Sequence, residues 1–378
     1  MQARLFDLPY LTADLPGTGG ILRTQDADFR VEEIPAYEPS GAGEHVFVLI
    51  EKRGLTTPAA AERLARAVDV STRDVGWAGM KDRHAITRQW LSLPPPVSAA
   101  AVRALEGLGA DTSGEPPGGD SNADAELRVL DVANHPHKLR TGHLSGNRFV
   151  ITVRQTEVDA EVAAERARAI LAALADGPGS PNWFGPQRFG RDGQNPALGR
   201  QLIADPAATG DRRRGPRGRQ KRLFISALQS ALFNEHLRRR LDDGLFAQVI
   251  AGDVLQKTQS GGIFGSDEPD VDQVRMDAGE VVPTGPMFGH KMRRPAEGSP
   301  AHEREQAILR DAELELSQFA RVGKLGVGTR RPLAVNIGAT AVTAVGEHAI
   351  ELSFSLPAGS YATALLREVV KGSTPFPG

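Results

Sequence analysis

The order of strand-like and helix-like segments along the chain constrains its fold more than any other feature of the sequence. Strand-like segments, rich in Val, Ile and Phe, occur near both ends of the chain, at 29–34, 45–52, 89–93, 126–133, 148–154 and 340–357. Gly, Pro and aromatic residues concentrate at 177–195, and helix-like periodicity dominates after that point. We therefore expect a discontinuous domain, 1–178 with 329–378, and a domain inserted at 179–328.

Helical segments are indicated by apolar residues at spacings of three and four and by residues that favour helix starts or ends. Pro58 suits the first turn of a helix over 57–68, and a last helix is expected between Ser360 and Gly372. The segment 109–125 combines Pro, Gly and acidic residues and is expected to form an exposed loop. The other expected helices span 98–108, 162–174, 226–241 and 300–320.

The composition limits the class of protein. With 378 residues, the chain exceeds the size at which one hydrophobic core usually stops growing. Charged residues make up an ordinary 24%, so we do not expect disorder throughout. Cysteine is absent, which excludes disulfides, thiolate metal sites and cysteine nucleophiles. Neither a signal peptide nor an uncharged apolar run of about 18 residues occurs, so we expect a cytoplasmic protein with no membrane association.

Any binding to RNA must depend on local charge clusters, because the net charge of the chain is −2. One cluster lies at 211–222, where a single acidic residue accompanies many basic ones. Such a segment is typical of a mobile loop that contacts phosphates, although a plain solvated loop has the same composition. The predicted RNA-binding residues of this basic segment are Arg212, Arg213, Arg214, Arg217, Arg219, Lys221 and Arg222.

The sequence contains no complete metal or cofactor motif. Residues 302–306, His-Glu-Arg-Glu-Gln, nearly match a zinc-binding helix, but Gln306 occupies the position of the second histidine ligand. The histidines at 135–143 alternate with Lys and Arg, which favours a basic connection facing RNA over a metal site. No phosphate-binding loop and no nicotinamide or flavin fingerprint occurs either. We predict that the protein uses no metal and no cofactor.

The segment 76–90 carries the strongest indication of chemistry. Asp82 lies between Lys81 and Arg83, after Gly79, which permits a sharp turn, and before an expected strand. Neighbouring positive charges favour an ionised carboxylate, and an ionised Asp held on a turn is a candidate nucleophile. The alternative is that Asp82 caps a turn while its charged neighbours are only solvated.

The same segment resembles the signature of the TruD family of tRNA pseudouridine synthases, a Gly-x-Lys-Asp-Arg/Lys-x-Ala-x-Thr-x-Gln pattern. Residues 79–89 match it at every specified position. The resemblance extends over about 17–370, and only the segment 109–125 looks longer than the family usually carries. Further segments that resemble the family follow in the family's order at 28–33, 43–45, 146–149, 182–190, 226–234 and 356–363.

This resemblance implies an α+β fold, in which a mixed, largely antiparallel sheet is flanked by helices and a TruD-specific domain is inserted. It also implies an activity, the isomerisation of the uridine at position 13 of certain tRNAs to pseudouridine. The partner would be tRNA, and no obligate protein partner is evident. The reaction breaks the N1–C1′ bond, turns the uracil and rejoins it through C5, so it requires no cofactor.

The resemblance further implies roles for individual residues. Asp82 would be the nucleophile, attacking either C6 of the base or C1′ of the ribose. Phe29, Asn147 and Phe354 match family positions that line the base pocket, and an Asn side chain can both donate to and accept from a uracil edge. Strand alternation leaves a core role open for Phe354 and indicates that Phe149 packs near the site.

Two basic residues are candidates for a supporting role. Pseudouridine synthases keep a basic side chain beside the catalytic Asp, and Arg23 aligns with a basic position of the family. Lys81 would keep Asp82 ionised, or alternatively contact an RNA phosphate. Since a uridine inside a folded tRNA is not accessible, we expect it to flip out to reach a buried carboxylate.

Two other functions fit parts of this pattern. A non-catalytic RNA-binding protein or tRNA chaperone on the same fold would keep its RNA affinity without Asp82 and would form no product. A glycoside or nucleoside hydrolase would also use Asp82 as a nucleophile. Such enzymes generally employ paired carboxylates, and the segment 81–83 offers no second one.

Overall fold

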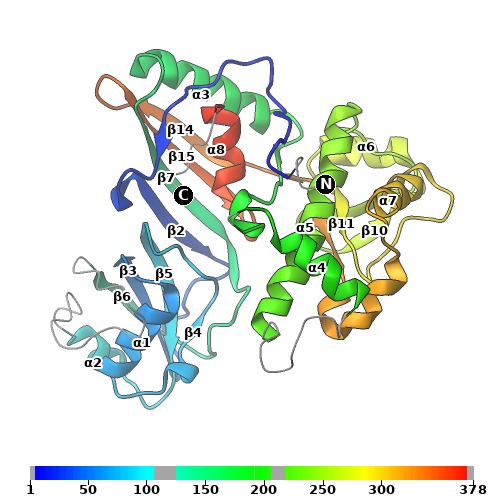
Figure 1. Ribbon diagram of the computed structural model, residues 1–378. Coiled ribbons are helices and arrows are strands. Elements are labelled where there is room, and N and C mark those ends of the chain that lie inside the picture. The colour runs from blue at the N-terminus through cyan, green and yellow to red at the C-terminus, as the bar shows by residue number, and fades with distance from the viewer. Residues whose placement is uncertain (1–4, 106–124, 191, 206–217, 373–378) are drawn as a thin grey trace. The chain divides into compact units, whose positions relative to one another are not determined.

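The structure is a computed structural model that describes residues 5–105, 125–190, 192–205 and 218–372 (Figure 1). The chain forms two compact units, and each is discontinuous in sequence. The sheet unit consists of residues 15–171, 337–362 and 369–378, and the middle unit consists of residues 1–14, 172–336 and 363–368. The insertion of a domain at 179–328 stays a prediction.

The sheet unit is built around one large sheet, in which the described residues form nine strands. Two short strands, β1 (Ile21–Leu22) and β4 (Gly76–Trp77), pair with β7 and β5. Every pairing is antiparallel except the parallel pair β2–β5, which confirms the predicted α+β class with a mostly antiparallel sheet. The other strands follow the order β14 (Gly338–Ala344), β15 (Ala349–Pro357), β7 (Leu144–Arg154), β2 (Phe29–Pro35), β5 (Ile86–Leu93), β3 (His45–Arg53) and β6 (Glu126–His135).

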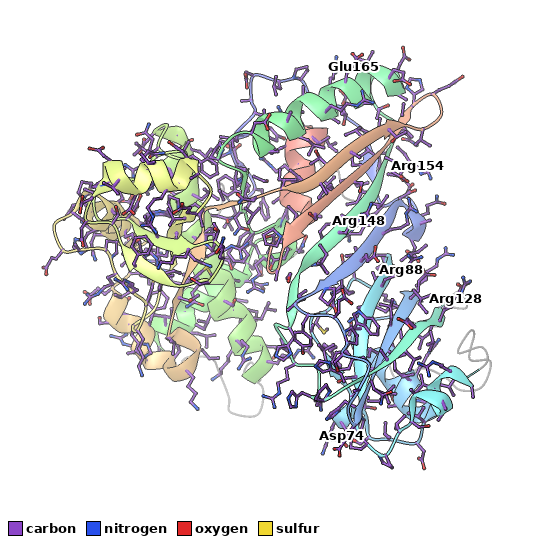
Figure 2. The ribbon with its side chains drawn as sticks, turned by 180° about the vertical axis from the view of Figure 1, so that it is seen from behind. Asp74, Arg88, Arg128, Arg148, Arg154 and Glu165 are labelled. Atoms are coloured by element: carbon purple, nitrogen blue, oxygen red, sulfur yellow. The ribbon has the colours of Figure 1, made fainter. Side chains whose placement is uncertain are left out.

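The outward face of this sheet carries a row of alternating charges. Figure 2 labels its three arginines, Arg88, Arg128 and Arg148. Glu32 on β2 lies opposite both Arg148 on β7 and Arg88 on β5. Glu51 on β3 in turn lies opposite Arg88 and Arg128 on β6. The three arginines are exposed, and each carboxylate is flanked by two of them, so cross-strand attraction supports this register.

The inward face is apolar except for a few buried polar side chains. Side chains alternate between faces along a strand, so Phe29, Val31 and Glu33 of β2 share this face. Lys52 on β3 lies opposite Thr87 on β5, and both are fully buried. Buried polar groups usually require partners, and one partner of Lys52 is the main-chain oxygen of Asp82, in the connection between β4 and β5.

The helix α1 (Thr57–Ala67) covers part of the inward face. Thr56 Oγ1 accepts a hydrogen bond from the main-chain N–H of Ala59, and Pro58 stands in the first turn, as predicted. The buried residues of α1 belong to the same core as Val48 and Ile50 of β3. Helices also form near the other expected ranges, at α2 (Ala99–Arg103), α3 (Ala160–Ala175) and α8 (Ala362–Val370).

Within its described residues, the middle unit contains a four-stranded antiparallel sheet, four complete α-helices and most of α8. The strand order is β10 (Ile263–Gly265), β9 (Val254–Lys257), β11 (Val281–Met287) and β12 (Thr329–Pro332). A separate pair joins β8 (Ser180–Pro181) to β13 (Ala334–Val335). The helices are α4 (Asn195–Ala204), α5 (Gly218–Asp242), α6 (Pro269–Asp277) and α7 (Pro300–Asp311), and α5 and α7 share a core with the 3₁₀ segment η5 (Leu316–Gly326).

Two expectations about secondary structure need correction, and a third is not tested. The helix expected at 300–320 is two elements, α7 and η5, because Glu313 has a φ of 49° and takes the chain out of the helix. The helix expected at 98–108 ends at Arg103 as α2. The loop expected at 109–125 lies outside the described residues, except for Ala125, which is buried.

The helix α5 changes the interpretation of the basic segment. It begins at Gly218, about two turns before the expected start, because the residues that precede Ser226 include good helix formers. Arg219, Lys221 and Arg222 therefore lie on a helix and not in a loop. The rest of the basic segment, 212–217, lies outside the described residues.

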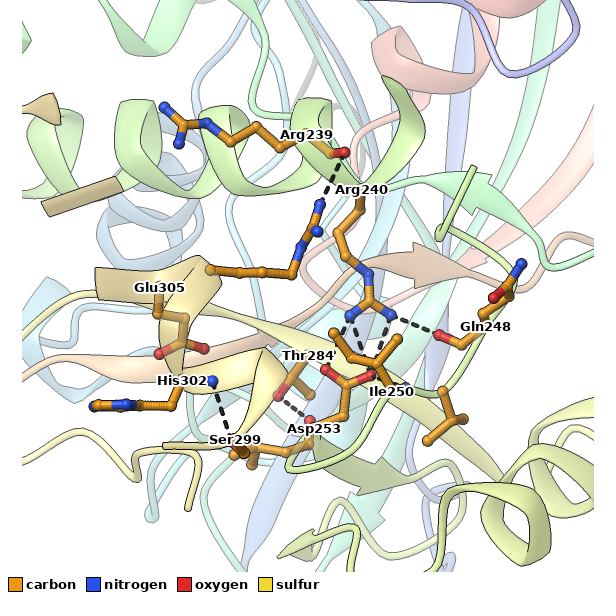
Figure 3. Close-up of polar contacts among 12 residues, drawn as sticks. Arg239, Arg240, Gln248, Ile250, Asp253, Thr284, Ser299, His302 and Glu305 are labelled. Carbon is orange, nitrogen blue, oxygen red and sulfur yellow. Dashed lines mark hydrogen bonds and ion pairs between the residues drawn. The ribbon is translucent and has the colours of Figure 1, made fainter. Parts of the chain in front are cut away.

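Buried ion pairs hold the middle unit together. Arg240 of α5 donates to both carboxylate oxygens of Asp253 and to the main-chain oxygen of Gln248 (Figure 3). Glu305 of α7 accepts from Arg330 of β12 at 2.6 Å. Burial raises the pKa of both carboxyl groups, and the paired guanidinium opposes that shift. The pair with Arg330 also explains why the zinc-like segment 302–306 uses Glu305 as a core residue.

No helix among the described residues is long and apolar enough to cross a membrane.

His236 of α5 predicts a pH dependence of stability. Burial, followed by the charges of Arg240 and Arg330, holds the pKa of His236 well below its ordinary 6.5. As the pH falls below 6.5, the unfolded chain takes up this proton and the folded chain does not. The free energy of unfolding should therefore fall by about 1.4 kcal/mol between about pH 7.5 and about pH 5.5.

Equilibrium urea unfolding of the wild type and of His236→Gln measures this contribution. The variant should lack this part of the pH dependence, whereas His348→Gln, which changes an exposed histidine, should keep it. The same pH dependence in wild type and His236→Gln would contradict the assignment.

Candidate active site

Asp82 lies in the connection between β4 and β5, with its side chain on the surface of the sheet unit. Its carboxylate Oδ2 accepts from Arg23 Nη2 at 2.8 Å. The Asp82 side chain is 55% exposed and the Arg23 side chain 27% exposed. The buried carboxylate expected from the sequence is therefore a half-exposed one, accessible to a large substrate. The structure places the predicted basic partner, Arg23, directly on it.

Arg23 is held in an unusual conformation. It follows β1 and has a φ of 59°, a region that residues other than glycine rarely adopt. Its guanidinium carbon lies 4.0 Å from the centre of the Phe29 ring, a cation–π contact. Its Nε atom is buried and has no hydrogen-bond partner. Strained residues persist where the surrounding structure holds them in place, and here it holds the Arg23 guanidinium against the Asp82 carboxylate.

The turn that carries Arg23 and Phe29 is anchored by Asp28. This carboxylate is 1% exposed and accepts three hydrogen bonds from Arg154 of β7, at 2.7 to 3.0 Å. It also accepts from Thr24 and Gln25. Burial raises the pKa of Asp28, but these hydrogen bonds outweigh burial and lower it overall. The Asp-Phe pair at 28–29 thus connects the turn to the sheet.

Buried side chains fix the main chain on the amino-terminal side of Asp82. Thr57 Oγ1 accepts from the main-chain N–H of Lys81 at 2.9 Å and donates to Gln89 Oε1 at 2.8 Å. The Gln89 amide donates to the main-chain oxygen of Gly79 at 3.2 Å. Both side chains are fully buried, on α1 and β5. The segment 79–82, which we call the catalytic loop, is therefore tied to the sheet and the helix.

The ammonium group of Lys81 forms a buried ion pair with Glu33 of β2. The Nζ–Oε2 distance is 2.6 Å, and the side chains are 4% and 1% exposed. This placement differs from both roles predicted for Lys81, since its charge is neutralised by Glu33 and is inaccessible to an RNA phosphate. Arg83, the other flanking cation, donates to the main-chain oxygen of Gly54 at 3.2 Å. Arg23 contacts the Asp82 carboxylate directly.

Lys52 of β3 is a second buried lysine beneath the catalytic loop. Its Nζ donates to the main-chain oxygens of Asp82 and Leu55 at 2.8 and 2.7 Å. Burial lowers its pKa to about 8, with a smaller contribution from Lys81, while the charge of Asp82 opposes the shift. Sequence reasoning missed Lys52 and Glu33. The sequence did hold an indication of both, because each is a charged residue at an inward strand position where the other inward residues are apolar.

The aromatic residues predicted around the site form one continuous contact. The Phe149 ring stacks on Phe354 with 5.3 Å between centres and meets Phe29 edge-on at 6.3 Å. All three side chains are at most 6% exposed. Phe149 thus packs against both other rings, and the burial of Phe354 fits the core role that alternation left open. Asn147 shares their face of β7, and its Oδ1 atom is buried without a partner.

Comparisons with known proteins agree with the motifs and the fold. The model of the family described as tRNA pseudouridine synthase D (TruD) matches residues 6–209 and 217–369. A protein of Anaeromyxobacter sp. (strain Fw109-5), named tRNA pseudouridine synthase D, is 45% identical over 98% of both chains. The chain belongs to the TruD family. A Thermus thermophilus member with the same name is 40% identical, covering 96% of this chain and 92% of its own.

The fold of the family is also seen in a solved structure. The crystal structure of a candidate TruD from Methanosarcina mazei matches with a TM-score of 0.73, covering 97% of this chain and 96% of its own. The two sequences are 24% identical, so this comparison speaks for the fold alone. It agrees with the mostly antiparallel sheet and its helices.

The buried pair Lys81–Glu33 predicts an asymmetric mutational response. Glu33→Gln leaves a buried ammonium without its counter-charge and should lower the free energy of unfolding by about 3–5 kcal/mol. The double variant Glu33→Leu/Lys81→Met removes both charges and should recover much of that loss. Breaking the exposed pair Arg128–Glu126 with Arg128→Met should cost at most about 1 kcal/mol.

Urea unfolding followed by circular dichroism measures all of these values. A double variant that loses as much stability as Glu33→Gln, or more, would contradict the ion-pair account.

Proposed function

We infer that this chain is a tRNA pseudouridine synthase, an isomerase that converts a uridine of tRNA to pseudouridine. The observation that carries the inference is the Asp82–Arg23 pair, presented on a rigid loop by a chain of the TruD family. The half-exposed carboxylate suits a macromolecular substrate, because the nucleotide must approach it from solvent. The loop beneath it is held by buried hydrogen bonds, which favours a nucleophile with fixed geometry.

The proposed reaction needs only groups that the sheet unit supplies. The N1–C1′ bond breaks, the uracil turns, a C5–C1′ bond forms, and the hydrogen on C5 leaves as N1 gains one. Substrate and product are isomers, so atoms and electrons balance without an oxidant or a donated group. We propose that Asp82 is the nucleophile, at C6 or at C1′, and that Arg23 orients its carboxylate and stabilises negative charge on the detached base.

Asn147 is the best candidate for reading the base. Its buried Oδ1 atom has no partner within the chain, and a buried acceptor without a partner costs about 1–3 kcal/mol. A uracil N3–H would satisfy this acceptor, and the amide nitrogen would donate to a neighbouring carbonyl. We propose that Phe29 and Phe354 flank the base, which requires their rings to be uncovered when tRNA binds.

We further propose the finer assignments implied by the family signature. The substrate nucleotide is the uridine at position 13, the segment 179–328 acts as the inserted domain, and the reaction takes place in the cytoplasm. The basic residues Arg219, Lys221 and Arg222 open helix α5, where Arg219 and Arg222 are exposed. Together with 212–217 they would attract the phosphates of tRNA.

The first test is product formation on an unmodified tRNA that carries a uridine at position 13. The wild type should form pseudouridine without added cofactor, and Asp82→Asn should be at least about 1,000-fold slower while binding the tRNA. Asp74→Asn, an exposed aspartate in the same unit, is the matched control and should keep full activity. Mass spectrometry of tRNA fragments locates the modified nucleotide.

The outcomes separate the alternatives. Binding of tRNA by both proteins with product from neither would favour the RNA-binding protein. A released free base would favour the hydrolase. Product from Asp82→Asn at the rate of the wild type would remove Asp82 from the reaction.

The basic segment predicts an electrostatic contribution to tRNA affinity. Reversing Arg212, Arg213 and Arg214 to Glu should weaken binding and lower the slope of log affinity against log salt by roughly 0.7–0.9 for each lost phosphate contact. The melting temperature should stay within a few degrees of the wild type. Fluorescence anisotropy across a salt series measures both quantities. Unchanged affinity at low salt would exclude this segment from the interface.

A further inference from the structure

Lys52 is the most unusual polar residue of the sheet unit. Its side chain is fully buried, it is the last inward residue of β3, and it follows Val46, Val48 and Ile50 on the same face. A lysine in such a row is costly, because burial of its charge must be offset by specific partners. No partner of Lys52 that the structure describes is a carboxylate within ion-pair distance. Its described hydrogen bonds go to main-chain oxygens.

These hydrogen bonds connect two segments that shape the site. Leu55 lies between β3 and α1, and Asp82 is the candidate nucleophile. An ammonium group has three N–H donors, and a neutral amine still has two. Both main-chain contacts of Lys52 can therefore survive the loss of its charge. A pH titration can therefore separate the effect of the Lys52 charge from the effect of its two hydrogen bonds.

The charged groups around Lys52 come from several elements. The charge of Asp82 opposes the lowering of the Lys52 pKa. The charge of Lys81 adds to the lowering, but Lys81 is paired with Glu33 of β2. Arg23 contacts the Asp82 carboxylate from the surface side. The strand neighbours Thr87 of β5 and Leu127 of β6 carry no charge. Lys52 is thus a buried cation on the main chain of Asp82 whose charge no described carboxylate neutralises at contact distance.

We propose that Lys52 is a positioning residue for the reaction, fixing the main chain of Asp82 and maintaining a buried positive charge beneath it. The proposal rests on the proposed function. A cation at this place lowers the energy of negative charge that develops on the detached uracil. The hydrogen bond to the Asp82 oxygen keeps the carboxylate aligned with the substrate, where small displacements are costly.

The pH profile distinguishes this role from simple packing. The pKa of Lys52 is about 8, so the rate of the wild type at saturating tRNA should fall as the pH rises through about 8. The free energy of unfolding should rise over the pH range in which the rate falls. The folded chain releases the proton near 8, whereas the unfolded chain holds it up to its ordinary 10.5, so the contribution of Lys52 to stability rises with pH between these values.

The decisive experiment compares single-turnover rates of the wild type, Lys52→Met and Lys257→Met at saturating tRNA from about pH 7 to about pH 9.5. Lys257 is exposed on β9 of the middle unit and serves as the matched control. Lys52→Met should be about 100-fold slower with unchanged tRNA affinity, and its rate should show no inflection near 8. Lys257→Met should follow the wild type. Unfolding of the same proteins gives the stability readout.

Each result is informative. A Lys52→Met variant with the rate of the wild type, or one that loses tRNA affinity in place of rate, overturns the proposal. Should this variant fail to fold, a wild-type rate that stays flat through pH 8 overturns it instead. Absence of product in the wild type contradicts the proposed function. Product in the wild type with an unaffected Lys52→Met contradicts the role of Lys52 alone.

Discussion

The site depends on the burial of two lysines, Lys81 within the catalytic loop and Lys52 beneath it. A charged ammonium leaves water only if acceptors or counter-charges are in place, so Lys81 requires Glu33 and Lys52 requires main-chain oxygens. Those partners exist only when residues 79–82 follow one path. Folding of the sheet unit and the conformation of the catalytic loop are therefore coupled. Asp82 lies half-exposed on that loop, and its carboxylate is paired with Arg23.

The two faces of the sheet carry different kinds of polar residues. On the outward face, arginines and glutamates alternate across neighbouring strands, and Arg88 forms an ion pair with Glu51. On the inward face, the few polar residues concentrate around the catalytic loop. Some of their atoms remain without a partner, including Asn147 Oδ1 and Arg23 Nε. Unpaired buried atoms are costly to a fold, and the proposed substrate would supply a partner for Asn147 Oδ1.

Much of this structure could be predicted from the sequence, and the failures have physical causes. The Val, Ile and Phe content of the strands and the proline at Pro58 located β2, β3 and α1, because these signals are local. The partner of Lys81 could not be found locally, since Glu33 is distant along the chain and the pair forms only when β2 and β5 align. The break at Glu313 was missed because no glycine or proline marks it. The proximity of Arg23 to Asp82 came from family resemblance, and no periodicity indicates it.

The most direct test of the account is a structure of the Asp82→Asn variant bound to an unmodified tRNA. The account predicts one flipped uridine at the sheet unit, with its C1′ or C6 atom within about 3.5 Å of the side chain at position 82. It also predicts that Asn147 Oδ1 accepts a hydrogen bond from the uracil. A complex in which tRNA binds but no nucleotide reaches residue 82, or in which the flipped base lies elsewhere, would contradict the account.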